Sequence, residues 1–166
     1  MMNIKRIVKH LAMTDWQLNQ AFPSQTLSAI ERAIKTSETA HRGEIRFAVE
    51  AALDGMPLFQ GQSARERAID VFSQLRIWDT EHNNGVLIYL LLADRDVEII
   101  ADRGIHAKAG STEWENICRK MEAAFKKAKF EGGVISGIQA VTQHLIEHFP
   151  ADGDARNELL DTPVVL

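Results

Sequence analysis

Cysteine is almost absent from this chain, since Cys118 is the only one among 166 residues. An internal disulfide therefore cannot form, and one chain cannot assemble a zinc site from several cysteines. A surplus of positive charge is also missing: 19 lysines and arginines face 23 aspartates and glutamates, which gives a formal net charge of −4. Without a basic field, the chain is not expected to bind nucleic acid. The scarcity of cysteine fits a reducing compartment such as the cytoplasm.

Long apolar runs are missing as well. The longest, Val86 to Ala93, is far too short to span a bilayer and is bounded by polar residues on both sides. The first residues, Met1 to Met13, mix basic and apolar side chains and lack the continuous apolar stretch of a secretory signal. We therefore expect a single domain that folds by burying a core between a sheet and helices on both of its faces.

Helical spacing of apolar residues is present in four segments. Two of them begin with the pattern of a capping box, Ser63 with Glu66 and Thr112 with Glu115, in which each side chain satisfies a free backbone N–H at the helix start. The four predicted helices run from Ser24 to about His41, from Ser63 to about Leu75, from Thr112 to about Lys129, and from Gly133 to about Phe149.

Three strands are predicted between these helices: Glu44 to Ala51, Val86 to Ala93, and Val97 to Ala101. The second and third are separated only by residues 94–96, which is long enough for a hairpin but too short for a parallel crossover. The first and second are separated by a loop, a helix and another loop, which predicts a right-handed crossover and parallel strands. The sheet is therefore expected to be mixed.

The chain divides into three parts. Residues 1–22 form a basic, amphipathic segment, residues 23–150 an α/β domain, and residues 151–166 a polar tail expected to be flexible. Two interpretations of the first segment remain open. Its apolar stripe could lie on the anionic surface of the inner membrane, or it could pack against the sheet or a second protomer. We favour packing, because one short helix binds lipid weakly.

Four stretches resemble the TPM domain family. They are residues 37–50 (SETAHRGEIRFAVE), 83–89 (NNGVLIY), 97–105 (VEIIADRGI) and 130–133 (FEGG) followed by a helix. The second is similar to the "N-G-V-L-L" strand of the family, and the third stands in place of its "v-x-I-x-x-G-x-G-L-E" pattern. The chain departs from that pattern at Asp102 and Arg103, where the family usually has a glycine.

The resemblance implies a three-layer α/β/α sandwich whose small mixed sheet has three to four strands. Many bacterial relatives carry a signal peptide and a membrane helix, whereas this chain is similar to a shorter soluble branch. Phosphatase activity is ascribed to a chloroplast member of the family, calcium binding to some bacterial members, and accessory roles in the repair or assembly of membrane complexes to others. Calcium is therefore the cation that the resemblance implies.

Polar residues are expected to converge at one edge of the sheet. In a parallel pair the amino ends of the two strands meet, and the hairpin returns the end of the third strand to the same edge. Three carboxylates there are the predicted cation ligands: Glu44, Asp79 and Asp102. Glu81 is expected nearby, and the residues predicted to take part in binding at this edge are Asn83, Asn84, Arg103 and Gly104.

Two accounts of these carboxylates remain open. Acids held close together raise one another's pKa, and a hard cation such as calcium or magnesium removes that cost. The more ordinary account is that Arg42, Arg46 and Arg103 neutralise them.

Two functions from different classes follow. The first is a non-catalytic accessory module that binds a protein partner. The second is a weak metal-assisted phosphatase in which a divalent ion orients water. We favour the first, because the sequence shows neither an obvious nucleophile nor an ordered acid and base pair.

Overall fold

A four-stranded mixed sheet forms the centre of the protein, with the strand order β3-β2-β1-β4. The computed structural model describes residues 3–153 and 156–166. The strands are β1 (Glu44–Glu50), β2 (Gly85–Leu91), β3 (Asp96–Ala101) and the short β4 (Val164–Val165). β1 pairs in parallel with β2, with Glu44 opposite Gly85, and β2 pairs antiparallel with β3. The predicted crossover and hairpin are both confirmed.

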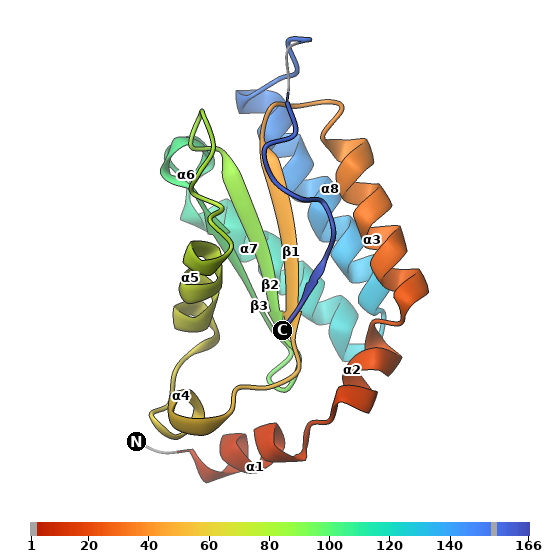
Figure 1. Ribbon diagram of the computed structural model, residues 1–166, viewed down its shortest axis with the longest axis vertical. Coiled ribbons are helices and arrows are strands. Elements are labelled where there is room, and N and C mark those ends of the chain that lie inside the picture. Colours follow the sequence, from red (N-terminus) through yellow and green to blue (C-terminus); the bar gives the residue numbers. More distant parts are fainter. Residues whose placement is uncertain (1–2, 154–155) are drawn as a thin grey trace.

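Helices cover both faces of this sheet (Figure 1). On one face, Ile45, Phe47 and Val49 of β1 point into the larger core, which is closed by α3, α7 and α8. On the other face, Leu87 and Tyr89 of β2 pack against α5 in a smaller core. The three-layer α/β/α sandwich is therefore confirmed. The helices are α1 (Ile4–Ala12), α2 (Asp15–Ala21), α3 (Ser24–Ser37), α4 (Gly55–Phe59), α5 (Ala64–Gln74), α6 (Arg103–Ala109), α7 (Ser111–Lys126) and α8 (Phe130–His148).

One of the two predicted capping boxes forms. At the start of α5, the Ser63 side chain accepts from the N–H of Glu66, whose carboxylate accepts from the N–H of Ser63 in return. The second prediction is wrong, because α7 begins at Ser111, is capped by Gly110 and has no side-chain cap. The reason is the unanticipated helix α6, which ends at Gly110, so Thr112 falls inside the first turn of α7.

The C-terminal segment supplies the fourth strand. Val164 and Val165 pair in parallel with Ala48 and Val49 of β1, and the N–H of Leu166 donates to the carbonyl of Val49 at 2.9 Å. The sequence shows no strand here, because two residues are too few for a periodic pattern. Residues 1–2 and 154–155, which belong to the expected N-terminal segment and tail, lie outside the described residues.

Within residues 3–153 and 156–166, every helix is too short or too polar to cross a bilayer.

Candidate functional site

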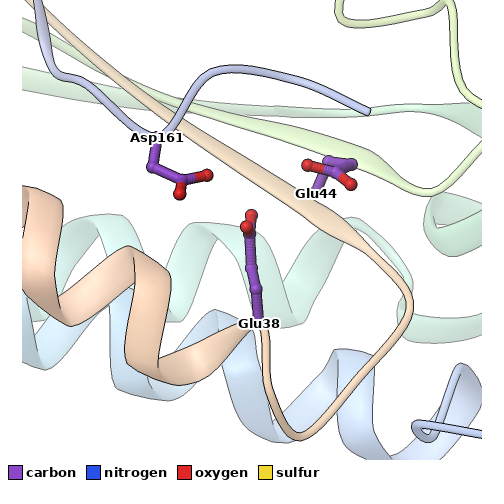
Figure 2. A group of neighbouring side chains, drawn as sticks. All are labelled: Glu38, Glu44 and Asp161. Atoms are coloured by element: carbon purple, nitrogen blue, oxygen red, sulfur yellow. The ribbon is translucent and has the colours of Figure 1, made fainter. Parts of the chain in front are cut away.

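Three carboxylates from distant parts of the chain meet beside the amino end of β1 (Figure 2). Glu38 follows the last residue of α3, Glu44 is the first residue of β1, and Asp161 lies in the C-terminal segment. Each offers a carboxylate oxygen, and these oxygens lie within 4.8 Å of one another. We call these three residues the acidic trio. Among the described residues it is the one group of potential metal ligands of this kind.

Hydrogen bonds fix two of the three carboxylates against the backbone. Oε1 of Glu38 accepts from the N–H of Ile45 at 2.9 Å, which joins the end of α3 to β1. The oxygens of Glu44 accept from the N–H groups of Glu158 at 2.9 Å and Leu159 at 3.3 Å. These bonds hold the C-terminal segment across β1.

The third carboxylate is oriented within its own segment. Both oxygens of Asp161 accept from the side-chain amide of Asn157, at 3.1 and 3.2 Å. A carboxylate oxygen that accepts one hydrogen bond keeps a further lone pair. The trio is therefore positioned by its neighbours without being saturated by them.

Burial makes the charge of the acidic trio costly. Burial, together with the neighbouring carboxylates of Glu44 and Asp161, raises the pKa of Glu38 to about 9, against the lowering effect of its hydrogen bond from Ile45. Burial also raises the pKa of Glu44 to about 7, against the lowering effect of its two backbone hydrogen bonds. At neutral pH the trio therefore holds protons that a cation could replace.

Arg46 is a basic residue whose charge interacts with all three of these acids. Its side chain is buried, which lowers its pKa, while the charges of Asp161, Glu38 and Glu44 act in the opposite direction. One of its Nη atoms donates to the carbonyl of Leu160. Lys35 also interacts with the charge of Asp161, so Arg46 is not the sole base that acts on the acidic trio.

The acidic trio lines a cavity of about 380 Å³. Three basic residues, Lys35, Arg42 and Arg156, also line it, together with His41. His41 is buried, which lowers its pKa to about 4, so its ring is neutral at neutral pH. The lining of the cavity therefore contains both the carboxylates of the acidic trio and three basic side chains.

The predicted ligands are not gathered into one set. Glu44 belongs to the acidic trio, but Asp79 is an exposed residue whose carboxylate pairs with Arg76 at 2.8 Å. Asp102 reaches the expected edge, because its N–H donates to the carbonyl of Gly85, the residue opposite Glu44. Its carboxylate instead caps α6 by accepting from the N–H of Arg103 at 2.7 Å.

The four predicted binding residues have structural contacts at this edge. Asn84 is fully buried, and its side-chain amide donates to the carbonyl of Arg42 at 3.2 Å. The carbonyl of Asn83 accepts from the N–H of Ile105, and Gly104 packs closely against the backbone of Asn83. Arg103 is exposed at the start of α6. These residues lie outside the acidic trio.

Sequence reasoning missed Glu38 and Asp161. Glu38 stands in the first stretch that resembles the TPM family, six residues before Glu44, but it falls within the helix predicted from Ser24 to about His41, so it was not assigned to the edge of the sheet. Asp161 lies in the segment expected to be flexible. The sequence offers no signal that this segment returns to cover β1.

The acidic trio fits a hard divalent cation. Calcium and magnesium prefer oxygen ligands at about 2.0 to 2.6 Å, so two ligands of one ion stand up to about 5 Å apart. The separation of the three oxygens, within 4.8 Å, agrees with that geometry. Glu38, Glu44 and Asp161 are the residues that would hold the ion.

The fold and this site define a class: a small α/β/α sandwich with a carboxylate pocket at the amino end of its central parallel strands. The family model of the TPM domain matches residues 17–144. The chain belongs to the TPM domain family.

Solved structures with the same fold include the BA42 protein of the psychrophilic bacterium Bizionia argentinensis. It is 29% identical, with a TM-score of 0.76 over 86% of this chain and 94% of that one. The N-terminal domain of a P. gingivalis protein is 19% identical, with a TM-score of 0.57 over 73% of this chain and 76% of that one, and shows the fold alone. No match is found among the curated proteins.

Proposed function

We propose that this TPM-domain protein is a non-catalytic binding module whose acidic trio takes a calcium or magnesium ion and whose ion-bound form binds a protein partner. The observation that carries the proposal is the approach of three carboxylate oxygens, from Glu38, Glu44 and Asp161, to within 4.8 Å. A cytoplasmic location is part of the proposal, and the single, buried Cys118 agrees with it.

An ion bound by the acidic trio would neutralise its carboxylates and would also stabilise the protein surface formed by the C-terminal segment. Glu38 and Glu44 belong to the body of the domain, whereas Asp161 belongs to the C-terminal segment. A cation bound by all three would tie that segment to β1 and stabilise the surface that it forms. Partner binding would then depend on the ion, because the surface is better ordered when the ion is present.

A metal-assisted phosphatase is the second candidate. The observation in its favour is that Lys35, Arg42 and Arg156 line the same cavity as the acidic trio and would suit the charge of a phosphate ester. We favour the binding module, because His41 is buried and neutral, and Thr39 donates its hydroxyl to the carbonyl of Thr36 at 2.7 Å. His41 and Thr39 therefore do not form the pair of general base and activated nucleophile that covalent catalysis requires.

Ion binding is tested by titrating the metal-free chain with calcium or magnesium and following its melting temperature. An ion at a hundred times its Kd stabilises a fold by about 2.7 kcal/mol, which for a chain of this size raises the melting temperature by roughly 5 to 10 °C. We expect Glu38→Gln and Asp161→Asn to lose this rise. Asp79→Asn is the matched control, since it removes an exposed carboxylate outside the trio and should keep it. An equal rise in all four proteins contradicts the proposal.

The two functions are separated by an assay with p-nitrophenyl phosphate, with and without the ion. Metal-dependent turnover that Glu38→Gln abolishes and Asp79→Asn retains would establish the phosphatase instead. Partner binding is tested by retaining proteins on the immobilised chain in calcium and eluting them with a chelator. The binding module predicts a protein that elutes from the wild-type chain and from Asp79→Asn but is not retained by Glu38→Gln.

A further inference from the structure

Exposed apolar side chains gather at the end of the molecule opposite the acidic trio. Among the described residues, eleven large apolar side chains are exposed, and six of them lie on α1, α2 and α4. These six, which we call the apolar end, are Ile4, Val8, Leu11, Trp16, Met56 and Phe59. In Figure 1, α1 and α4 lie together at the end where β1 and β2 finish. Exposed apolar side chains that lie together at one end of a molecule can mark an interaction site.

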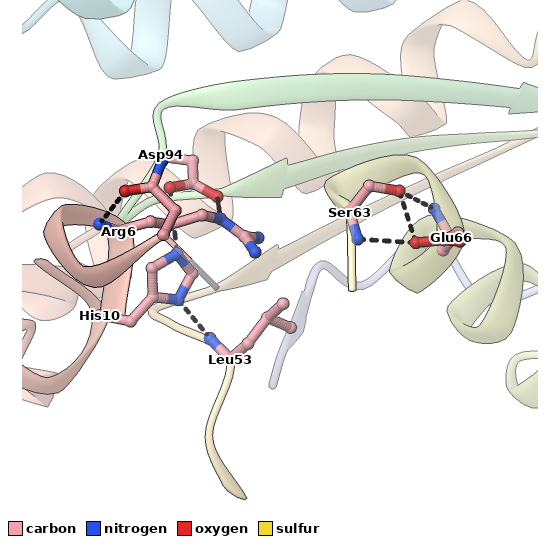
Figure 3. Close-up of polar contacts among 7 residues, drawn as sticks. Arg6, His10, Leu53, Ser63, Glu66 and Asp94 are labelled. Carbon is pink, nitrogen blue, oxygen red and sulfur yellow. Dashed lines mark hydrogen bonds and ion pairs between the residues drawn. The ribbon is translucent and has the colours of Figure 1, made fainter. Parts of the chain in front are cut away.

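The orientation of α1 is fixed from its other side (Figure 3). Nε of Arg6 pairs with Asp94 at 2.9 Å, and Nε2 of the buried His10 lies 3.0 Å from the same carboxylate. Nδ1 of His10 accepts from the N–H of Leu53 at 2.9 Å. Because Arg6 and His10 bind the domain, the opposite face of the helix must point away from it.

That outward face is an apolar stripe. Ile4, Val8 and Leu11 follow the spacing of one helical face, and they are 69%, 59% and 66% exposed. A helix of a water-soluble domain normally turns such a stripe toward the core. Here Arg6, His10 and the partly buried Ile7 face the domain, so Ile4, Val8 and Leu11 are left on the surface. The expectation that the whole stripe packs against the sheet is wrong for these three residues.

Positive charge accompanies the stripe. Lys5 and Lys9 are exposed on α1 and lie next to the stripe around the helix. The helix contains no acidic residue, and Arg95 is exposed in the turn whose Asp94 anchors Arg6. The nearest acid in sequence, Asp15, is the first residue of the next helix, α2. This basic flank contrasts with the net charge of −4 of the whole chain.

We propose that the apolar end docks on an anionic lipid bilayer, with Ile4, Val8 and Leu11 in the acyl boundary and Lys5 and Lys9 among the headgroups. An apolar stripe flanked by lysines is the composition of a helix that lies in a membrane interface. Trp16 suits the same depth, because its ring is amphipathic. The docked domain carries its acidic trio at the far end, facing away from the bilayer.

The experiment is co-sedimentation of the full chain with vesicles of phosphatidylcholine alone or mixed with phosphatidylglycerol. We expect binding to the anionic vesicles, weakened by salt. The double variant Val8→Ser with Leu11→Ser should bind at least about tenfold more weakly. Lys5→Gln with Lys9→Gln should weaken binding to anionic vesicles by about tenfold. All four side chains are exposed, so an unchanged melting temperature will show that the fold is kept.

Ile69→Ser is the matched control, because Ile69 is 46% exposed on α5, outside the apolar end. It should bind vesicles as the wild type does. The proposal is overturned if the wild type does not sediment with anionic vesicles, or if Ile69→Ser loses as much binding as the double variant. A dimer by light scattering that the Val8 and Leu11 changes convert to a monomer, without vesicle binding, would make the apolar end an interface between two copies and would also overturn it.

Discussion

The backbone N–H of Glu158 donates a hydrogen bond of 2.9 Å to Oε1 of Glu44, although 114 residues separate the two in sequence. Together with the bond from Leu159 to the same carboxylate, it brings the C-terminal segment over the polar face of β1. Asp161 thereby reaches Glu38 and Glu44. The candidate site exists only while this segment is docked.

Removal of the segment should therefore weaken both the fold and ion binding. A chain ending at Arg156 leaves the buried Glu44 and Arg46 without their backbone partners and removes β4. We expect a loss of about 2 to 4 kcal/mol in the free energy of unfolding, measured with urea. The ion-dependent rise in melting temperature should also disappear.

A chain ending at Pro163 is the control for this truncation. It lacks β4 but keeps residues 158–161, so it should lose less stability and still respond to calcium or magnesium. If the chain ending at Arg156 is as stable as the full chain, the segment does not contribute to the fold, and the expectation of a flexible tail gains support.

The elements of the fold could be predicted because their signals are local. The apolar spacing of α3, α5 and α8, the capping box at Ser63 and the short connection between β2 and β3 each lie within a few residues. The alternating pattern of β1 predicts a strand with one polar face. It does not reveal that Glu44 and Arg46 are buried, since the C-terminal segment that buries them is distant in sequence.

The candidate site was less predictable for the same reason. Glu44 was found because it begins a strand that the predicted crossover brings to the same edge as Asn83 and Asn84, and the structure pairs it with the next residue, Gly85. Asp102 lies at the expected edge, beside Gly85, but its role as the cap of α6 depends on a helix that the sequence did not predict. Asp161 depends on a contact between distant segments, for which no periodic pattern exists.

Stability should fall as the pH rises through about 6, because of Asp96. Burial, together with the nearby carboxylates of Glu98 and Glu122, raises the pKa of Asp96 to about 6. The folded chain thus binds this proton more tightly than the unfolded chain, whose ordinary value is 3.8. The resulting stability is present below about pH 4 and is lost as Asp96 ionises in the folded chain.

Asp96→Asn removes this titration. After discounting for partial exposure, the variant should be about 1 kcal/mol more stable than the wild type near pH 8, with no gain near pH 4. Urea unfolding at several pH values measures the difference. Asp94→Asn is the comparison, since it breaks the pairs with Arg6 and His10 and should destabilise the fold. A loss of stability in Asp96→Asn near pH 8 would contradict the prediction.

Two glycines should respond to alanine in opposite directions. A Cβ on Gly104 would stand 2.5 Å from the carbonyl oxygen of Asn83 and 2.6 Å from that of His82, both of which are backbone atoms. Gly104→Ala should therefore cost about 1 to 3 kcal/mol of unfolding free energy. Gly132, in the first turn of α8, has nothing within 4 Å of the same position.

Gly132→Ala should stabilise the chain by up to about 1 kcal/mol, because alanine is the better helix former. Thermal and urea unfolding of both variants measure the contrast. Equal effects of the two substitutions would show that α6 does not approach Asn83 as closely as the structure indicates.

The buried group formed by Glu50, Arg67 and Tyr89 should behave as a coupled unit. Glu50 accepts two hydrogen bonds from Arg67, at 2.9 and 3.0 Å, and one from the hydroxyl of the fully buried Tyr89. Burial and the Glu50 carboxylate both raise the pKa of Tyr89, so its hydroxyl keeps its proton and remains a donor.

Tyr89→Phe should cost about 1 kcal/mol of unfolding free energy, because Arg67 continues to satisfy Glu50. Glu50→Gln should cost more, about 2 to 3 kcal/mol, because it leaves the charge of Arg67 without its partner. If the hydroxyl of Tyr89 mainly stabilises the charge of Glu50, the double variant will cost less than the sum of the two single changes. Urea unfolding of the two single variants and the double variant measures the coupling, and strict additivity would show that Tyr89 and Glu50 contribute independently.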